Sequence, residues 1–316
     1  MSKSKLTRRD FSRFVVGSSL TAGVATGAAE MPARPLGKIG FRASIIGLGA
    51  QRVADRPMEQ SAVNELIAEA IDGGLNYIDT ACGYGRSEEH LGHALQGNRD
   101  KVFLVSKTRS AARADAMKDV EESLRLLRTD RIDCYHIHNF GRTERFPDIE
   151  ETLSEDGALG ALIEAKKQGK IRHIGCTSHM RPERVLPAFA TGEIEVFMCQ
   201  LNFVEQHIYN FEDKVLPEAR RRGIAVIGMK VLGGPAPGNV TARLASAEDY
   251  EATLRYVWGV PGVAVAIIGM RSREELNQAL SAARQYRPFS NGELAKVSER
   301  GREMARDWGT LRGPLA

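Results

Sequence analysis

The sequence predicts one α/β domain in which eight parallel strands close into a barrel and each strand is followed by a helix. Two observations predict this fold. Short apolar runs alternate with longer amphipathic segments from residue 34 onward, and no linker of distinct composition interrupts the alternation. Continuous apolar strands separated by helices are typical of a parallel sheet buried on both faces. The 316 residues fit one (β/α)8, or TIM, barrel, since about 250 residues suffice for that fold.

The predicted strands are apolar runs, and the predicted helices are the amphipathic segments between and after them. The strands span residues 43–48, 75–78, 102–106, 131–137, 171–176, 195–199, 224–228 and 263–268. The helices span residues 59–72, 88–95, 112–127, 157–168, 182–190, 212–222, 247–258 and 273–283. Three helices are followed by a glycine, Gly73, Gly169 or Gly223, which is the preferred residue at a C-terminal cap.

Two further elements flank the eight units. Residues 35–41 are expected to form an N-terminal β-hairpin that closes the bottom of the barrel, and residues 291–308 an extra C-terminal helix. The alternative fold is a doubly wound sheet with an appended domain. That fold opens its first helix with a GxGxxG loop, and residues 47–50 (Gly-Leu-Gly-Ala) match this motif poorly, so the barrel is preferred.

Residues 1–29 are predicted to be a signal peptide, which leaves residues 30–316 for the barrel. Arg8 and Arg9 precede a mildly apolar segment of small residues, 14–29. This order is typical of a secretory signal, and the paired arginines resemble the twin-arginine (Tat) signal, which exports folded proteins. The apolar segment is too short for a stable membrane anchor. The alternative is a disordered basic tail.

This signal predicts the Tat export machinery as a partner and a periplasmic or exported location, with the cytoplasm as the location if the signal is not used. The net charge of +4 lies entirely within residues 1–29, which hold five Lys or Arg and one Asp. The rest of the chain is therefore neutral, and no basic face for nucleic acid is expected. The four cysteines form no CxxC pair, so a cysteine metal site is not expected either.

Polar residues gather at the carboxyl ends of three neighbouring predicted strands, where barrel enzymes build their active sites. Asp79 follows the second apolar run, and Tyr84 lies in the glycine-rich turn after it. Lys107 follows the third run and His138 the fourth. If each residue is considered alone, the alternative interpretation is structural: Tyr84 would be a surface turn residue, and Asp79 and Lys107 would form an ion pair in the barrel rim. Taken together, the four predict a pocket that holds an acid, a phenol, an amine and an imidazole.

The chemistry of this set is coherent. A phenol with its ordinary pKa of about 10 holds its proton at neutral pH and can donate it to a carbonyl oxygen. The ammonium of Lys107 favours the phenolate that remains, and Asp79 supplies the counter-charge that a buried lysine requires. His138 can donate a hydrogen bond to the same carbonyl oxygen and orient it. The set therefore predicts polarisation of a C=O group for hydride transfer.

These residues resemble the Asp–Tyr–Lys–His tetrad of the aldo-keto reductases, on the strands where that family places it. The resemblance extends over residues 34–283. It implies that Tyr84 is the proton donor, that Asp79 and Lys107 tune it, and that His138 orients the substrate. His136 lies two residues before His138 on the same strand. It is expected to be a packing neighbour. No histidine or carboxylate cluster on other strands completes a metal site, so no metal is expected.

The resemblance also implies a nicotinamide site. Thr177 and Ser178 stand where the family has a Ser-Asn pair that binds the carboxamide, and Gln200 resembles the glutamine that shares this task. Two positions depart from the family pattern. Met229 replaces an aromatic residue that stacks on the nicotinamide ring, and Glu275 falls where members that prefer NADPH often have an arginine for the 2′-phosphate.

The last two predicted strands end alike, in Gly-Met-Lys and Gly-Met-Arg. Lys230 and Gly233 follow the first of them, and Gly269 and Arg271 follow the second. The loops at this position commonly bind phosphate in barrels, so the four residues are predicted to hold the diphosphate. A carboxylate at Glu275 would repel a 2′-phosphate or bind a ribose hydroxyl. Arg271 or Arg273 could compensate for this carboxylate, and the resemblance to the family implies NADP(H) as the cofactor, with NAD(H) as the alternative.

The sequence thus predicts an exported oxidoreductase that transfers hydride between a nicotinamide dinucleotide and a small carbonyl or alcohol. The alternative is an exported nucleotide-binding barrel that acts as a sensor or a partner subunit with little turnover, because nicotinamide dinucleotides are scarce outside the cytoplasm. Substrate selection is expected in the loops 50–56, 140–152 and 231–244. These loops contain few aromatic residues and predict no particular substrate.

Overall fold

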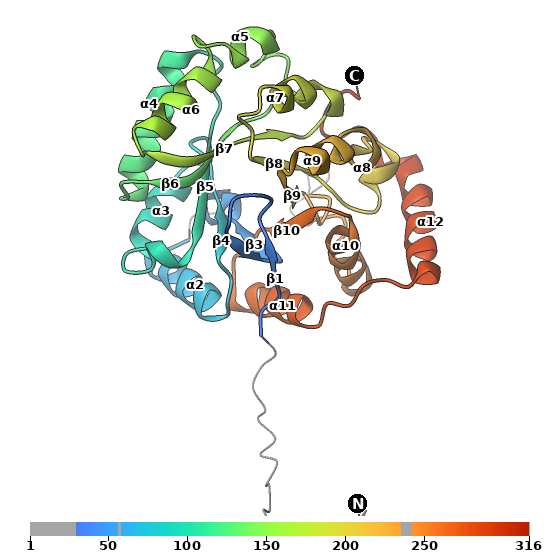
Figure 1. Ribbon diagram of the computed structural model, residues 1–316. Helices are drawn as coiled ribbons and strands as arrows, with labels where there is room; N and C mark the ends of the chain where they lie inside the picture. The colour runs from blue at the N-terminus through green and yellow to red at the C-terminus, as the bar shows by residue number, and fades with distance from the viewer. Residues whose placement is uncertain (1–29, 56–57, 235–241, 316) are drawn as a thin grey trace, which may run out of the picture.

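A computed structural model of the protein describes residues 30–55, 58–234 and 242–315, and it contains a closed barrel of eight parallel strands (Figure 1). In chain order the barrel strands are β3 (Ile46–Gly49), β4 (Tyr77–Asp79), β5 (Phe103–Thr108), β6 (Ile132–Ile137), β7 (Ile171–Ser178), β8 (Val196–Gln200), β9 (Ala225–Met229) and β10 (Val263–Ile268). Consecutive strands are neighbours, and β10 pairs with β3 to close the sheet. The predicted (β/α)8 barrel is confirmed.

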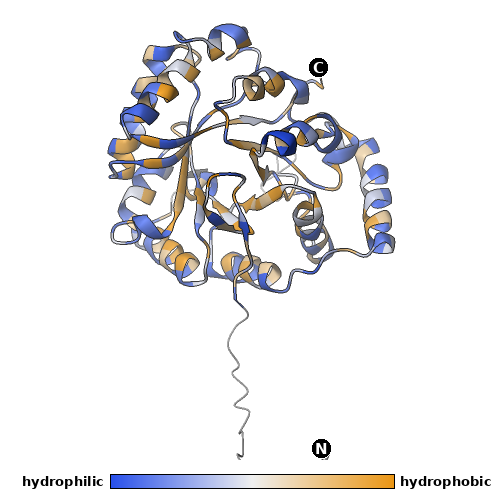
Figure 2. Ribbon diagram, in the orientation of Figure 1, coloured by the Kyte–Doolittle hydropathy of each residue, from blue (hydrophilic) through white to orange (hydrophobic). Residues whose placement is uncertain are grey.

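Helices surround the barrel and present polar residues to the outside (Figures 1 and 2). They are α1 (Gln51–Asp55), α2 (Gln60–Asp72), α3 (Ser87–Ala94), α4 (Arg113–Leu127), α5 (Ile149–Leu153), α6 (Ala158–Lys167), α7 (Leu186–Ala190), α8 (Phe211–Lys214), α9 (Leu216–Arg222), α10 (Ala247–Gly259), α11 (Arg273–Arg284) and α12 (Asn291–Trp308), with short 3-10 turns η1 (Arg99–Lys101), η2 (Pro182–Val185) and η3 (Glu205–His207). The extra C-terminal helix, α12, begins with a capping box between Ser290 and Glu293. The predicted helix is therefore confirmed at the residues expected.

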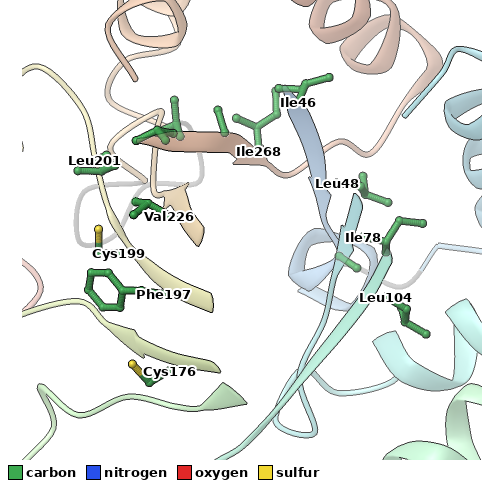
Figure 3. Packing of buried hydrophobic residues seen from close by; sticks show 14 of the residues in the cluster. Ile46, Leu48, Ile78, Leu104, Cys176, Phe197, Cys199, Leu201, Val226 and Ile268 are labelled. Carbon is green, nitrogen blue, oxygen red and sulfur yellow. The ribbon is translucent and has the colours of Figure 1, made fainter. Parts of the chain in front are cut away.

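Strand side chains alternate between the barrel lumen and the helical layer. On β5, Phe103 and Val105 face the lumen, whereas Leu104 packs outward against the helices. Figure 3 shows labelled members of the outer layer, among them Ile78 and Leu104, which point away from the lumen. Because of this period of two, Asp79 on β4 and Lys107 on β5 share the lumen face with the apolar residues below them.

A hairpin closes the bottom of the barrel. It consists of β1 (Ala33–Pro35) and β2 (Arg42–Ser44), paired antiparallel, and the intervening Leu36 is fully buried in the lumen cluster. The predicted strand 43–48 is wrong in one respect, because its residues belong to two strands. The chain turns at Ile45, where the Ser44 hydroxyl donates a hydrogen bond to the carbonyl of Ile46. Ser44 is the only polar side chain in this run, and isoleucines occupy positions 45 and 46, so its hydropathy does not mark the break.

The predicted helix 212–222 is likewise two helices, α8 and α9, which meet at Val215. Pro217 lies in the first turn of α9, where a missing amide hydrogen costs nothing, and proline is disfavoured inside a continuous helix. The predicted signal, residues 1–29, lies outside the described residues. Of the helices in the described ranges, none is long and apolar enough to cross a bilayer.

Candidate active site

The polar residues predicted on β4 and β5 form a buried ion pair. Nζ of Lys107 lies 2.6 Å from Oδ2 of Asp79 and donates a second hydrogen bond, also 2.6 Å, to the carbonyl of Thr80. The Lys107 side chain is 1% exposed. Burial alone would lower the pKa of Lys107, but the charge of Asp79, together with Tyr84, raises this pKa above its ordinary value. Lys107 is therefore an ammonium ion in the floor of the site.

Tyr84 lies directly over this ammonium. Nζ of Lys107 is 4.9 Å from the centroid of the Tyr84 ring, and a side-chain hydrogen bond also joins the two residues. A cation at this distance from an aromatic ring is attracted to the face of the ring. The phenol, the ammonium and the Asp79 carboxylate thus form a contiguous series, and any negative charge that develops on the phenol oxygen is stabilised by Lys107.

The turn that carries Tyr84 is anchored at both ends. The Thr80 hydroxyl donates to the Ser87 hydroxyl (2.9 Å), and Ser87 donates to the carbonyl of Ala50 on the neighbouring loop (3.0 Å). Within the turn, the amide of Ser87 donates to the Tyr84 carbonyl. Ser87 is also the first residue of α3, so the start of the helix and the end of the strand together fix the position of the phenol.

His138, which follows β6, faces the same cavity. Its Nδ1 lies 2.7 Å from the Thr177 hydroxyl, so Nε2 is the ring nitrogen that remains for a ligand. Burial, and then the positive charges of Lys107 and Lys230, hold the pKa of His138 well below its ordinary value. The imidazole is therefore neutral and acts through a hydrogen bond and not as a cation.

His136, two residues earlier, lies one layer deeper in the lumen. It is fully buried, and an added Cβ on Gly175 of β7 would come within 2.6 Å of its Nε2. Gly175 therefore leaves room for this ring. Burial and the charge of Lys107 hold the pKa of His136 well below its ordinary value. The prediction that His136 is a packing neighbour agrees with this position, since His136 does not line the cavity above it.

A cleft of about 300 Å³ opens at the carboxyl ends of β3, β4, β9 and β10. It brings together Asp79, Tyr84, Met229, Lys230 and Gly269 of the predicted residues. This cleft is called the groove below; one end lies at the phenol of Tyr84 and the other at Gly269, after β10. Met229 is the last residue of β9 and forms part of its floor.

None of the three predicted carboxamide-binding residues lines this groove. Gln200 is buried at the end of β8, and its Oε1 accepts no hydrogen bond from the described residues, whereas its Nε2 lies 3.5 Å from Glu205. Thr177 points into the lumen and contacts His138. The hydroxyl of Ser178 instead donates to the carbonyl of Met180 (2.5 Å) and does not line the groove.

The predicted diphosphate-binding residues are only partly brought together. Arg271 and Glu275 pair with each other: a Glu275 carboxylate oxygen accepts from the Arg271 amide (2.8 Å) and the other from its guanidinium (3.1 Å). Neither residue lines the groove. Gly233 has φ +71° and lies under Trp308, whose ring an added Cβ would approach within 2.7 Å. Its neighbour Gly234 lines the groove instead.

Five arginines that sequence reasoning did not single out also line the site. Arg52 of α1 lines the groove, and the other four border the side of the site beyond Tyr84. Arg109 comes from the loop after β5, Arg142 and Arg145 from the loop after β6, and Arg312 from the segment after α12. The sequence contained a signal for Arg109, because it is two residues after Lys107 and so continues the lumen-facing side of the strand. It contained none for Arg312, which reaches the site only through tertiary packing.

The segment after α12 is fastened to the barrel by hydrogen bonds to Tyr209. The Tyr209 hydroxyl accepts from the amide of Arg312 (3.1 Å) and donates to the carbonyl of Gly313 (2.8 Å). The Arg312 guanidinium donates to the carbonyl of Gly233 (2.6 Å). The C-terminal segment and the loop after β9 therefore close the same side of the site. Within the described residues, no group of three His, Cys, Asp or Glu side chains is arranged to hold a metal ion.

The chain is similar to known proteins. Residues 45–249 match the model of the Aldo/keto reductase family. The aldo-keto reductase YhdN of Bacillus subtilis is 31% identical over 233 residues, which are 67% of this chain and 64% of that protein. The NADH-specific methylglyoxal reductase of Escherichia coli is 26% identical over 284 residues, covering 81% of this chain and 79% of that protein.

A solved structure shares the fold. The aldo/keto reductase of Klebsiella pneumoniae in complex with NADP and acetate superimposes with a TM-score of 0.66 at 24% identity, covering 83% of this chain and 92% of that chain. In YhdN, the matched part is just under two thirds of the protein's length. The family match covers the strands from β3 to β9, and with them each residue of the predicted tetrad.

Proposed function

Because this chain belongs to the aldo-keto reductase family and is an oxidoreductase, we propose that Tyr84 is its proton donor in the reduction of a small carbonyl compound by NADP(H). One observation carries the assignment: Tyr84 contacts the buried ammonium of Lys107, which is itself paired with Asp79. Proton donors work best where the base that they leave is stabilised. The arrangement supplies that stabilisation at the phenol of Tyr84.

The proposed chemistry divides between the cofactor and the chain. The bound nicotinamide dinucleotide supplies a hydride, which forms the new C–H bond at the carbonyl carbon. Tyr84 gives its proton to the carbonyl oxygen, so that the product is an alcohol and the residue becomes a phenolate. Lys107 stabilises the phenolate until it is reprotonated from solvent. Nε2 of neutral His138 donates a hydrogen bond that holds the carbonyl oxygen beside the phenol.

The residues in and next to the groove fit a nicotinamide dinucleotide. Gln200 does not line the groove but lies beside Met229 on the neighbouring strand, and its buried Oε1 is an acceptor for the amide hydrogens of a carboxamide. Met229 offers a polarisable thioether as the surface under the ring. Gly269 and Gly234 line the far end, where backbone can approach a diphosphate closely, and Lys230 lies near enough to balance its charge.

We propose NADP(H) as the preferred nucleotide, with NAD(H) as the alternative. Members of the family differ in this respect: the Klebsiella enzyme is described with NADP, and the Escherichia coli enzyme as specific for NADH. The ion pair between Arg271 and Glu275 supports a mixed preference. Glu275 reduces the positive charge that Arg271 offers to a 2′-phosphate, and Arg271 in turn prevents full repulsion of that phosphate.

The function is tested by nucleotide binding and turnover with the purified protein. Titration with NADPH and NADH gives the two dissociation constants, and a panel of aldehydes and ketones is then followed by loss of the reduced nucleotide. Saturable turnover of at least one carbonyl, together with nucleotide binding, is the expected result. Tight nucleotide binding with no turnover across the panel would instead favour a binding protein.

We also propose export through the twin-arginine pathway. The support for it is the sequence of residues 1–29 alone, with Arg8 and Arg9 ahead of an apolar segment. Export of the folded chain would let a nucleotide bound in the cytoplasm travel with it. Cell fractionation of the intact chain, compared with the Arg8→Lys/Arg9→Lys variant, tests this. Equal amounts of both proteins in the periplasmic fraction would refute a twin-arginine route.

A further inference from the structure

A second cavity of about 300 Å³ lies beside the phenol, next to the nucleotide groove. Tyr84, His179 and Lys230 border both cavities, so the second one is the space that a substrate enters from the side of the phenol. Its other walls come from the loops after β5 and β6 and from the C-terminal segment. These loops lie on the opposite side of the barrel mouth from the β9 and β10 loops that border the groove.

The wall of this cavity is cationic. Its basic residues are Arg109, Arg142, Arg145, Lys230 and Arg312, and none of the residues that line it is Asp or Glu. Arg142 pairs with Glu144 (2.8 Å), and this pair is well exposed. The guanidinium groups of Arg109 and Arg145 form no ion pair with any carboxylate among the described residues. Such an excess of positive charge in a concave site attracts anions.

Arg109 is held close to the reacting group. Its guanidinium packs on Gly83, the residue before Tyr84, because an added Cβ at Gly83 would lie 2.6 Å from its Nη1. Any side chain at position 83 would therefore displace the arginine. The contact places a planar, permanently charged donor beside the turn that carries the phenol. When the carbonyl group of a ligand lies at Tyr84, another group a few bonds along the same ligand can therefore contact the Arg109 guanidinium.

The loop that carries the other two arginines is fixed by backbone contacts. The guanidinium of Arg184 donates to the carbonyls of Phe140 (2.9 Å) and Phe146 (2.5 Å), at the two ends of the loop. The amide of Arg145 donates to the carbonyl of Arg142 (3.2 Å), which closes a turn between them. Both phenylalanines are fully buried. The loop is therefore preorganised, and little ordering entropy is lost when a ligand binds.

Two imidazoles lie in the positive field of this wall: His138 is buried and His179 is partly buried. Burial, and then the positive charges of Lys230, Arg312 and Arg142, hold the pKa of His179 well below its ordinary value. Arg109 is among the groups that lower the pKa of His138. Such a field favours the binding of an anion.

From these observations we propose that the substrate is a small carbonyl compound bearing an anionic group, a carboxylate or a phosphate, which Arg109 and Arg145 bind while Tyr84 and His138 engage the carbonyl. The inference rests on the proposed function, because it assigns the substrate class of the same site. A cavity of this volume holds a molecule of a few carbon atoms with one such group. Arginine recognises both anions through paired N–H donors.

The test compares neutral and anionic substrates that are otherwise alike. Butanal is paired with 4-oxobutanoate for a carboxylate, and glyceraldehyde with glyceraldehyde 3-phosphate for a phosphate. The wild-type kcat/KM is expected to be at least about 10-fold higher for one anionic member than for its neutral partner. The pair that shows the preference identifies the anion. The preference is expected to shrink in high salt, since exposed charges are screened.

Variants locate the effect. Arg109→Gln and Arg145→Gln are each expected to lower kcat/KM for the anionic substrate by about 10- to 100-fold, which is the usual effect of a charged hydrogen bond. The readout is the ratio of kcat/KM for the anionic substrate to kcat/KM for its neutral partner, and this ratio is expected to fall toward 1 in both variants. Arg125→Gln, which removes an exposed arginine of α4 outside both cavities, is the matched control and changes neither substrate.

A binding measurement separates this inference from the proposed function. Calorimetric titration with succinate and with glycerol 3-phosphate, neither of which is an aldehyde or ketone, needs no turnover. Binding of one of them that is lost in Arg109→Gln supports the anion site even if no carbonyl is reduced. Equal kcat/KM for both members of each pair overturns the inference and leaves the reductase intact. The inference also fails if Arg109→Gln weakens NADPH and the anion equally, because the arginines then serve the nucleotide.

Discussion

Nδ1 of His138 and the hydroxyl of Thr177 lie 2.7 Å apart, across the contact between β6 and β7. This contact directs Nε2 toward the cavity, and burial keeps the pKa of the ring well below its ordinary value. A neutral imidazole acts through a hydrogen bond and not through a charge. The proposed orienting role therefore needs no protonation of the ring near neutral pH.

The first prediction concerns pH. A plot of kcat/KM for a neutral aldehyde is expected to show no inflection near pH 6.5, because His138 does not gain a proton there. Thr177→Val should lower kcat/KM about 10-fold, while Thr177→Ser, which keeps the hydroxyl, should not. An inflection near pH 6.5 that disappears in His138→Gln would show that the imidazole gains a proton in the working enzyme. That result would contradict the neutral imidazole inferred from its burial.

The second prediction concerns the phenol. Tyr84→Phe is expected to lower kcat by about 10²- to 10⁴-fold, which is the usual contribution of a general acid. The dissociation constant of NADPH should change little, since the ring remains in place. Tyr286→Phe is the control, because Tyr286 packs against Trp258 away from both cavities. Carbonyl reduction by Tyr84→Phe at the wild-type rate would remove Tyr84 from the proposed mechanism.

The third prediction concerns the buried ion pair. Asp79→Asn leaves the Lys107 ammonium without its partner and is expected to cost about 3–5 kcal/mol of unfolding free energy. The double variant Asp79→Asn/Lys107→Met removes both charges and should be more stable than Asp79→Asn alone. Urea unfolding of the wild type, Asp79→Asn, Lys107→Met and the double variant measures this. A double variant whose loss equals the sum of the two single losses would show that the pair is not coupled.

The fourth prediction concerns nucleotide preference. Glu275→Gln removes the carboxylate that pairs with Arg271 and frees the guanidinium for a 2′-phosphate. The ratio of the NADPH and NADH dissociation constants should shift about 3- to 10-fold toward NADPH. Glu274→Gln, one residue earlier and exposed, is the control for net charge. If both variants shift the ratio equally, the ion pair has no special role in the preference.

The fifth prediction concerns stability at high pH. Burial raises the pKa of Glu212 to about 7, although Tyr256 donates to its carboxylate (3.1 Å). Since the folded-state pKa lies above the ordinary value near 4.5, the stabilising contribution is complete below pH 4.5 and is lost as the pH rises through 7. Glu212→Gln should therefore raise unfolding free energy at pH 8 by on the order of 1–2 kcal/mol and leave it unchanged at pH 4. Thermal unfolding at the two pH values measures the difference.

The barrel and the floor of its site were predictable because both follow from local patterns. Eight apolar runs mark the strands, and the period of two along β5 carries Lys107 to the lumen face. The failures lie where the local pattern is silent. Apolar residues continue through Ile45 although two strands meet there, and an amphipathic pattern continues through Val215 although the helix breaks.

The cofactor end was harder for a different reason. Arg271 and Glu275 are four residues apart at the start of α11, and that spacing alone predicts their ion pair. When Arg271 and Glu275 are each considered only as contacts for the nucleotide, their pairing with each other is missed. The arginines of the substrate cavity are scattered from Arg109 to Arg312, and only the closed barrel brings them to one place.

The hydrogen bonds between Tyr209 and the segment after α12 hold that segment against the barrel. Ligand affinity therefore depends on the fraction of molecules in which the segment is docked. A ligand that contacts Arg312 binds only molecules in which the segment is in place, so its apparent affinity is scaled by the docked fraction. By reciprocity, the bound ligand holds the segment down. Tyr209→Phe removes the hydroxyl that holds the segment, so it would lower the apparent ligand affinity although Tyr209 touches no ligand. Saturation with ligand would hide this effect.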